Sequence, residues 1–194
     1  MNFLAHLALS GKSQNLTIGN FLGDFVKGNL IGQYDKEVEL GIKFHRAIDA
    51  YTDHHLLIKL SKKRFGSRFR RIGGIMVDIA YDHLLALSWD KFYDEPIDRF
   101  SQRVLEDVLA FKELPWEAEN LAKMMLRKNS LEKYKNEEFL NNASLSIHKR
   151  LKNRTPMLEA PEVIKNVKAE LDRDFVLFYP QLIDFAAEWL QEND

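Results

Sequence analysis

The sequence predicts an all-α fold arranged as a single domain. Apolar residues recur at three- and four-residue intervals through most of the chain, which is the pattern of amphipathic helices. Alternating apolar and polar residues bounded by turn residues, the pattern of β-strands, are absent. The length of 194 residues corresponds to one domain at roughly 150 residues per domain. We therefore expect a multi-helix bundle over 1–194, with about seven helices.

The first half of the chain is predicted to contain three helical segments and one loop. A short apolar helix is expected over 2–10. Segment 11–34 is rich in glycine and asparagine, so we expect a loop there, with a helical turn after Asn20. Apolar residues at helical spacing continue over 36–64, and a further helix is predicted over 67–90.

Prolines help to place the helices of the second half. Pro96 and Pro115 suit the first turns of two helices, where the missing N–H of proline costs no hydrogen bond. One or two more helices are expected over 131–152. A long helix is expected over 161–191, with a kink or break near Pro180.

The distribution of special residues along the chain favours a functional first half. All nine glycines lie at or before Gly74, and all five prolines lie after residue 95. Glycine supplies backbone conformations that binding loops often need. We expect residues 1–92 to carry the site, and residues 93–194 to supply helical support and part of a docking surface. Five of the six histidines also lie in the first part, namely His6, His45, His54, His55 and His83.

Composition excludes several classes of function. The chain has no cysteine, so disulfide scaffolds, thiol nucleophiles and iron–sulfur clusters are excluded. The formal net charge of −1 argues against a global basic surface for nucleic acid. Neither a targeting signal nor an apolar run of about 18 residues is visible, so we expect a soluble, cytoplasmic protein.

Acidic residues and histidines recur at helical spacing in two segments. His45, Asp49 and Asp53 are spaced i, i+4 and i+8, which places them on one stripe of a helix with neighbours about 5–6 Å apart. Asp78 and Asp82 repeat the i, i+4 spacing within an apolar segment. Carboxylates on a largely buried helix are costly unless they are paired, protonated or bound to a metal.

Two further features join these segments. His83 follows Asp82 directly, and Asp24 lies between glycines with Lys27 three residues later. Taken singly, an Asp–His pair is most often a surface or capping contact, and His6 on its apolar helix reads as a buried core histidine. Three separate acid-bearing segments together favour a metal site. Oxygen and nitrogen donors without thiolate suit Mn²⁺, Mg²⁺ or Fe²⁺.

A run of basic residues without any acid extends over 56–77. It is either a solvated helix face or a docking surface for an acidic partner or a phosphate-bearing substrate. Phe65 and Phe69 interleave with the bases, as in sites for single-stranded nucleic acid, but the near-neutral net charge disfavours that interpretation. The basic residues are Lys59, Lys62, Lys63, Arg64, Arg68, Arg70 and Arg71.

Four segments carry a resemblance to a known family: MNFLAHLALS, GNFLGDFVKG, GIKFHRAIDAYTDHH and DIAYDHLLALSW. In this order and spacing they resemble the acyl carrier protein phosphodiesterase family, densely over 1–92 and loosely beyond. The resemblance implies an all-α fold that is a divergent relative of the HD metal phosphohydrolases. It also implies removal of the 4′-phosphopantetheine arm from holo-acyl carrier protein with a divalent metal, usually manganese. Because acyl carrier protein is strongly acidic, the basic run would then dock it.

The chain departs from the family pattern at several points. It has no adjacent His-Asp pair, from which the HD superfamily takes its name, and carries only the reverse order, Asp-His. Ala8 stands where relatives often have a second histidine in the opening motif, so an imidazole there is not a required ligand. Leu56 stands where the family has proline after its TDxH motif.

The residues and the resemblance together predict a metal centre. Asp53 or His54 is expected to move protons on water or on the leaving serine oxygen. Lys27 and Arg46 are expected to neutralise the substrate phosphate. The expected ion is Mn²⁺, with Mg²⁺ and Fe²⁺ as alternatives. The expected metal ligands are Asp24, His45, Asp49, Asp78, Asp82 and His83.

Two other functions stay open from the sequence. A site of this type would also suit hydrolysis of a nucleotide or another small phosphoester without a protein partner. The third function is a non-catalytic helical interaction module, in which the buried acids and histidines pair only with one another. If the protein is an acyl carrier protein phosphodiesterase, its partner is an acidic acyl carrier protein, and we expect neither nucleic acid nor a membrane to be involved.

Overall fold

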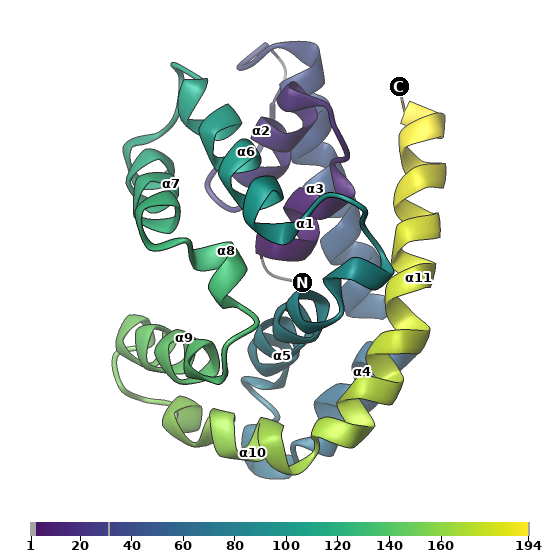
Figure 1. The fold of residues 1–194 in the computed structure, drawn as a ribbon, viewed down its shortest axis with the longest axis vertical. Helices are drawn as coiled ribbons and strands as arrows, with labels where there is room; N and C mark the ends of the chain where they lie inside the picture. The colour runs from purple at the N-terminus through teal and green to yellow at the C-terminus, as the bar shows by residue number, and fades with distance from the viewer. Residues whose placement is uncertain (1–2, 31, 194) are drawn as a thin grey trace.

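The computed structural model describes residues 3–30 and 32–193, which form eleven α-helices and three short 3₁₀ turns without any strand (Figure 1). The all-α prediction is confirmed, although the helices outnumber the expected seven. The helices are α1 (Phe3–Leu9), α2 (Gln14–Leu22), α3 (Lys36–His54), α4 (Leu56–Arg64), α5 (Gly73–Leu87), α6 (Ile97–Ala110), α7 (Trp116–Lys128), α8 (Ser130–Lys133), α9 (Glu137–Arg150), α10 (Ala160–Asn166) and α11 (Lys168–Asn193). The turns are η1 (Ser67–Phe69), η2 (Trp89–Lys91) and η3 (Pro156–Glu159).

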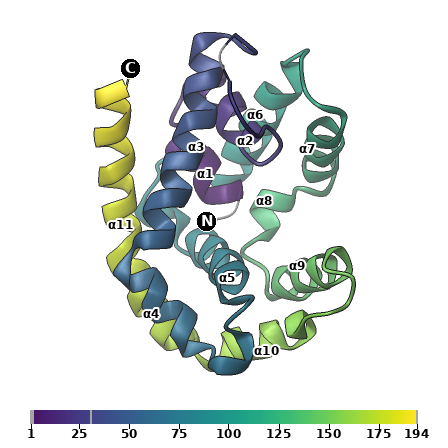
Figure 2. The ribbon, with the colours of Figure 1, turned by 180° about the vertical axis from the view of Figure 1, so that it is seen from behind.

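The N-terminal helices form the centre of the molecule. Helices α2 and α3 pack along each other, α1 contacts both α2 and α5, and α6 contacts α2. Helix α11 runs along α4 and α3 on one side, while α7 to α10 continue around the other side (Figures 1 and 2). Large buried side chains such as Phe21, Phe44, Tyr81 and Phe178 fill the space between these layers. Among the described helices, none is long and apolar enough to cross a membrane.

Segment 11–34, predicted as a loop, instead contains helix α2. Ser13 caps this helix by accepting a hydrogen bond from the backbone N–H of Leu16 at 3.2 Å. Its glycine serves close packing, because a Cβ on Gly19 would overlap the carbonyl oxygen of Val38 on α3. A Cβ on Gly41 would in turn crowd the backbone of α2. Glycine here brings two helix backbones into contact, which is why the composition-based loop prediction was wrong over Gln14–Leu22.

Two predicted long helical segments are interrupted at unexpected residues. The 36–64 segment breaks at His55, which ends α3 and caps α4 by accepting the N–H of Leu57 at 3.2 Å. The 161–191 segment breaks at Val167, whereas Pro180 lies inside the continuous helix α11. Proline leaves the carbonyl four residues earlier without an intrahelical donor. That residue, Val176, is 53% exposed, so water can satisfy its carbonyl.

The remaining helix boundaries are close to the predictions. Pro96 and Pro115 immediately precede α6 and α7 rather than occupying their first turns. The predicted helix over 67–90 is divided into η1, α5 and η2, and the 131–152 segment is divided between α8 and α9.

A buried polar cluster joins α4, α5 and α11. The guanidinium of Arg64 donates to both carboxylate oxygens of Asp174, at 2.6 and 2.8 Å. Ser61 donates its only hydroxyl proton to Asp174 at 2.8 Å, so the Tyr81 hydroxyl must donate to Ser61, also at 2.8 Å. Burial raises the pKa of Asp174, but the bonds from Arg64 and Ser61 outweigh burial and hold that pKa below its ordinary value.

Candidate metal centre

Three side chains from α1 and α3 converge at one point. Nε2 of His6 lies 3.2 Å from Oδ1 of Asp49, and Nε2 of His45 lies 3.3 Å from Oδ2 of the same carboxylate. The two imidazole rings are stacked, with centroids 4.0 Å apart and planes 20° apart. One ligand atom from each residue lies within 4.8 Å of the others, so the group could hold a metal ion.

The other nitrogen of each ring is bonded to Asn20 on α2. Nδ1 of His45 lies 2.8 Å from the backbone carbonyl of Asn20, and Nδ1 of His6 lies 3.0 Å from its side-chain oxygen. Both oxygens can only accept, so each Nδ1 carries a proton and donates it. In the neutral form of each ring, Nε2 therefore presents a lone pair to Asp49.

The electrostatics of this arrangement call for a positive charge between the rings and the carboxylate. Burial, together with the nearby His45, lowers the pKa of His6 to about 4. At neutral pH an uncharged imidazole of His6 thus faces a carboxylate, and a bound cation would satisfy both groups.

The distances also fit a first-row divalent ion. Two ligand atoms that each lie about 2.1 Å from one ion, at about 90–110° to each other, are about 3.0–3.4 Å apart. The separations of 3.2 Å from His6 to Oδ1 and 3.3 Å from His45 to Oδ2 of Asp49 each fall in that range. Imidazole nitrogens and a carboxylate together suit Mn²⁺, Fe²⁺ or Zn²⁺ better than Ca²⁺, which prefers oxygen ligands.

Asp24 lies at the open side of this group. Its Oδ1 is 3.9 Å from Nε2 of His45, and the carboxylates of Asp24 and Asp49 are 50% and 48% exposed. The two imidazoles, by contrast, are 3% and 5% exposed. Gly23 makes this approach possible, because a Cβ at that position would overlap the His45 ring. The site therefore has a buried imidazole floor and a carboxylate rim that faces solvent.

The three predicted ligands on α5 are not part of this group among the described residues. Asp82 is fully buried and accepts the N–H of Leu4 at 2.9 Å, in the first turn of α1. This contact satisfies a helix N-terminal donor and fixes the helix that carries His6. Asp78 is partly buried and lies one helical turn before Asp82 on α5.

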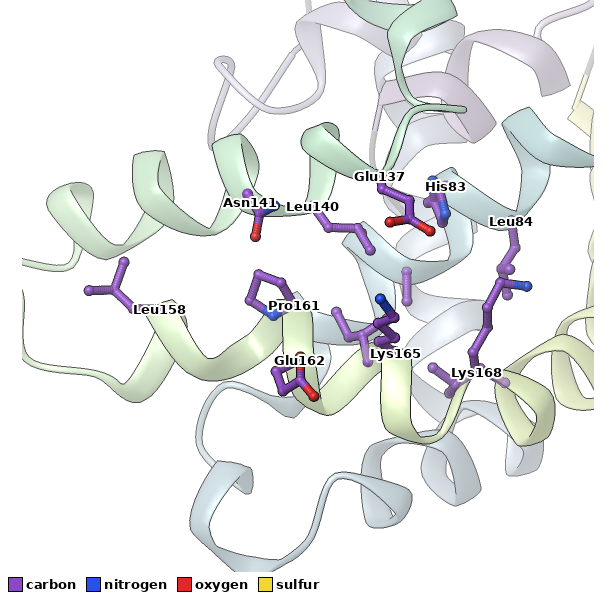
Figure 3. A pocket seen from close by; sticks show the side chains of 13 residues that line it. His83, Leu84, Glu137, Leu140, Asn141, Leu158, Pro161, Glu162, Lys165 and Lys168 are labelled. Carbon is purple, nitrogen blue, oxygen red and sulfur yellow. The ribbon is translucent and has the colours of Figure 1, made fainter.

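His83 lies against a different region of the molecule. Its Nδ1 donates to the backbone carbonyl of Tyr134 at 2.6 Å, and burial lowers the pKa of the ring. It lines a pocket of roughly 250 Å³ between α5, α9 and α10 (Figure 3). Glu137 and Lys165 are among the other residues that line it, and apolar side chains such as Leu140 form part of its wall. The structure therefore places His83 apart from the His6–His45–Asp49 group.

The residues expected to handle protons lie near the end of α3. Asp53 is 71% exposed and accepts a hydrogen bond from Lys62 at 2.9 Å. His54 is exposed, and its Nδ1 donates to the carbonyl of Ala50 at 2.7 Å, which leaves Nε2 as an acceptor. Asp53 is one helical turn beyond Asp49 on the same stripe.

The two residues expected to bind phosphate differ in how many hydrogen bonds they already make within the protein. Lys27 is exposed, and its ammonium donates to the carbonyl of Gly23 at 3.3 Å. Arg46 donates to the carbonyls of Val26 and Gly28, both at 3.1 Å. Arg46 therefore braces the loop after α2.

Some members of the basic run form ion pairs with acidic residues of the protein, and others are exposed to solvent. Arg64 belongs to the buried Asp174 cluster, Arg68 pairs with Glu159, and Lys62 pairs with Asp53. The aromatic side chains of this run are buried, so they offer no stacking surface for bases. The exposed members of the run outside these three pairs are Lys59, Lys63, Arg70 and Arg71.

Sequence reasoning missed two residues of this site. His6 was expected to be a core histidine, and Asn20 was expected only to precede a helical turn. One feature of the sequence could have identified them, because a polar side chain in an apolar segment needs a buried partner. The sequence spacing of His6, Asn20 and His45 gives no indication that they meet.

The fold and this group together define an all-α protein with a His/Asp site of the kind that holds divalent metals. The chain belongs to the acyl carrier protein phosphodiesterase family, whose family model matches residues 1–182. The match thus extends well beyond the densely resembling first 92 residues. No solved structure matches the chain, so the relation to HD phosphohydrolases is not confirmed.

Three relatives illustrate the similarity. The acyl carrier protein phosphodiesterase of Photorhabdus laumondii is 32% identical over 190 residues, which cover 96% of this chain and 95% of the relative. That of Serratia proteamaculans is 30% identical over 192 residues, which cover 97% and 98%. That of Pectobacterium atrosepticum is 40% identical over 101 residues, or 52% of each chain.

Proposed function

We propose that the protein hydrolyses the phosphodiester that joins 4′-phosphopantetheine to a serine of holo-acyl carrier protein. The observation that carries the proposal is the pair of imidazole Nε2 atoms facing the Asp49 carboxylate, in a chain of the acyl carrier protein phosphodiesterase family. In this reaction water adds to phosphorus, the bond from phosphorus to the serine oxygen breaks, and that oxygen takes up a proton. The products are 4′-phosphopantetheine and the apo-carrier.

The proposed metal ligands are His45 and Asp49, joined by His6 and with Asp24 at the rim. Mn²⁺ is the proposed ion, because imidazole and carboxylate donors both suit it. When bound, such an ion supplies Lewis-acid polarisation of a phosphoryl oxygen and activation of water. We assign Asp82 to fixing the first turn of α1, since its carboxylate accepts the N–H of Leu4.

The other two predicted ligands on α5 receive supporting roles in this proposal. His83 ties α5 to the segment between α8 and α9 through its bond to Tyr134. Asp78 lies on α5, one turn before Asp82, and we assign it a structural role on the same helix.

The charged residues around the rim have distinct proposed tasks. Lys27 neutralises the substrate phosphate, because its ammonium extends from the loop that also carries Asp24. His54 moves the proton, because its Nε2 is an exposed acceptor. Asp53, paired with Lys62, keeps the end of α3 in place beside it.

We further propose that the exposed part of the basic run docks the acidic carrier protein. Lys59 and Lys63 are spaced i, i+4 on α4, which directly follows the helix that carries His45 and Asp49. Opposite charge at such a surface mainly raises the association rate and sets orientation.

The direct test is incubation of the protein with holo-acyl carrier protein and Mn²⁺, followed by intact-mass analysis of the carrier. The expected result is loss of the mass of the phosphopantetheine arm from the carrier. The Asp49→Asn variant should leave the carrier mass unchanged, whereas the control Asp94→Asn, which alters an exposed carboxylate in a loop, should cleave the arm as the wild type does. An unchanged carrier mass would contradict the proposal. Cleavage of only small phosphodiesters would favour a hydrolase without a protein partner.

A further inference from the structure

Asn20 is a fully buried amide that contacts both imidazoles of the metal centre. We propose that Asn20 is a positioning residue, whose side chain fixes the tautomer of His6 and so keeps Nε2 of His6 available as a ligand atom. This inference rests on the proposed metal site. It concerns the residue that prepares the site rather than the residues that would touch the ion.

The orientation of the Asn20 amide follows from its contacts on α1. Its nitrogen lies 2.6 Å from the carbonyl oxygen of His6 and 2.9 Å from the hydroxyl of Ser10. A carbonyl oxygen can only accept, so the atom facing it must be the NH₂ group. The amide oxygen is therefore turned toward the imidazoles, 3.0 Å from Nδ1 of His6.

An amide oxygen in that place selects one tautomer of His6. It can only accept, so Nδ1 must carry the hydrogen and Nε2 must keep its lone pair. The opposite tautomer would set the Nδ1 lone pair against the Asn20 oxygen, where no cation can lie between them, whereas the Nε2 lone pair faces Asp49 across the proposed ion position. Bonds from the second ring nitrogen are known to orient metal-binding histidines in this way.

His45 is held differently, and this difference makes the inference testable. Its Nδ1 donates at 2.8 Å to the backbone carbonyl of Asn20, which any residue at position 20 would supply. The side-chain oxygen is a longer contact at 3.2 Å. Substitution of the Asn20 side chain should therefore release the tautomer of His6 and leave that of His45 unchanged.

The experiment measures the tautomers of the metal-free protein, labelled with ¹⁵N-histidine, by two-bond ¹H–¹⁵N correlation spectroscopy. In the wild type, both His6 and His45 are expected to carry the hydrogen on Nδ1. In Asn20→Ala, His6 is expected to become a mixture while His45 stays as before. The dissociation constant for Mn²⁺, measured by electron paramagnetic resonance, should rise about 10- to 100-fold.

Two further variants separate positioning from loss of stability. Ser10→Ala removes one partner of the same amide but leaves its oxygen in place, so both tautomers and Mn²⁺ affinity should be retained. Asn20→Asp keeps an acceptor opposite His6 but loses the donor bonds to α1. It should therefore unfold at a lower temperature and yet retain the Nδ1–H tautomer of His6.

Several results would overturn the inference. These are an Nε2–H tautomer of His6 in the wild type, an unchanged His6 or equal changes of both rings in Asn20→Ala, or loss of the Nδ1–H tautomer of His6 in Asn20→Asp. Failure of the wild-type protein to bind Mn²⁺ or to cleave the carrier would contradict the proposed function. In that case a selective response of His6 would still support control of its tautomer by Asn20.

Discussion

Gly23 follows the last residue of α2 and lies against the His45 imidazole, so the metal centre requires a residue without a Cβ at this position. The backbone of Gly23 has φ −54° and ψ −30°, which any residue can adopt, but a Cβ there would overlap the ring. We predict that Gly23→Ala displaces His45, weakens Mn²⁺ binding at least tenfold and destabilises the fold by about 1–3 kcal/mol. Manganese titration and urea unfolding would measure both effects.

Gly74→Ala is the matched control for this prediction. A Cβ at Gly74 would meet Lys62 at 3.5 Å, which is ordinary van der Waals contact. Because alanine is favoured over glycine inside a helix by about 0.5–1 kcal/mol, this variant should be neutral or slightly stabilised with normal metal binding. Equal behaviour of the two variants would show that overlap with His45 is not the cause.

Asp49 and Asp82 are both predicted ligands, but they should respond differently to substitution. Asp49→Asn removes a half-exposed carboxylate that faces two imidazoles, so we expect loss of Mn²⁺ binding and of turnover with a folded protein. Asp82→Asn weakens a buried contact to the N–H of Leu4, so we expect a loss of about 1–3 kcal/mol in unfolding free energy. Mn²⁺ affinity and chemical unfolding of both variants test this, and the reverse pattern would place the metal on α5.

At this scale the sequence predicts part of the site and misses the rest for a physical reason. His45 and Asp49 are one helical turn apart, so local spacing places them together. His6 reaches them from another helix, through an imidazole that stacks on His45 at 4.0 Å. Asp82 indeed needs a buried partner, but that partner is a backbone N–H, which leaves no trace in the spacing of side chains.

Helix α11 is fixed to α4 by the pair of Arg64 and Asp174, and this pair should make stability depend on pH. The Asp174 pKa is lower in the folded protein than in the unfolded chain. Its contribution is therefore complete above the unfolded pKa of about 4 and is lost as pH falls through the folded value. Urea unfolding between pH 7 and pH 3 should show this loss.

Asp174→Asn supplies the comparison for the pH series. It leaves Arg64 without its carboxylate partner, so we expect a loss of about 3 kcal/mol at pH 7. The variant should also lose less stability than the wild type on acidification. Parallel pH profiles for the two proteins would exclude Asp174 as a source of the acid sensitivity.

The presence of a helix is easier to predict from this sequence than the residues at which the helix begins and ends. Apolar spacing predicts helices over nearly all the segments where they occur, since burial of one face stabilises them. The exceptions depend on tertiary contacts. Gly19 permits the packing of α2 on α3, and Pro180 is tolerated inside α11, where the carbonyl left without a donor belongs to the half-exposed Val176. Neither effect is visible in local composition.

The whole molecule divides its tasks between the metal site and its surroundings. The His/Asp group is built from α1 and α3 and is bonded to Asn20 on α2, while α5, α6 and α11 contact these helices from several sides. Helix α4 continues from α3 and presents basic side chains on the surface. The family match over 1–182 includes the helices that surround the site as well as those that form it.

The last prediction concerns this surface and the proposed carrier protein. Neutralising the exposed basic residues should lower kcat/KM for holo-acyl carrier protein at least tenfold and flatten its dependence on salt, because electrostatic steering would be lost. Hydrolysis of a small phosphodiester should stay within about twofold, since the metal centre is untouched. The residues to change to glutamine are Lys59, Lys63, Arg70 and Arg71.

A second variant carries the same change in net charge on the far side of the molecule, at and around α7 (Figure 1). Its exposed basic residues, also changed to glutamine, are Lys112, Arg127, Lys128 and Lys133. If docking uses the surface on and after α4, this control should keep its kcat/KM for the carrier. Equal losses in both variants would mean that net charge alone attracts the carrier. Equal losses for carrier and small substrate in the first variant would assign those residues to phosphate binding or folding instead.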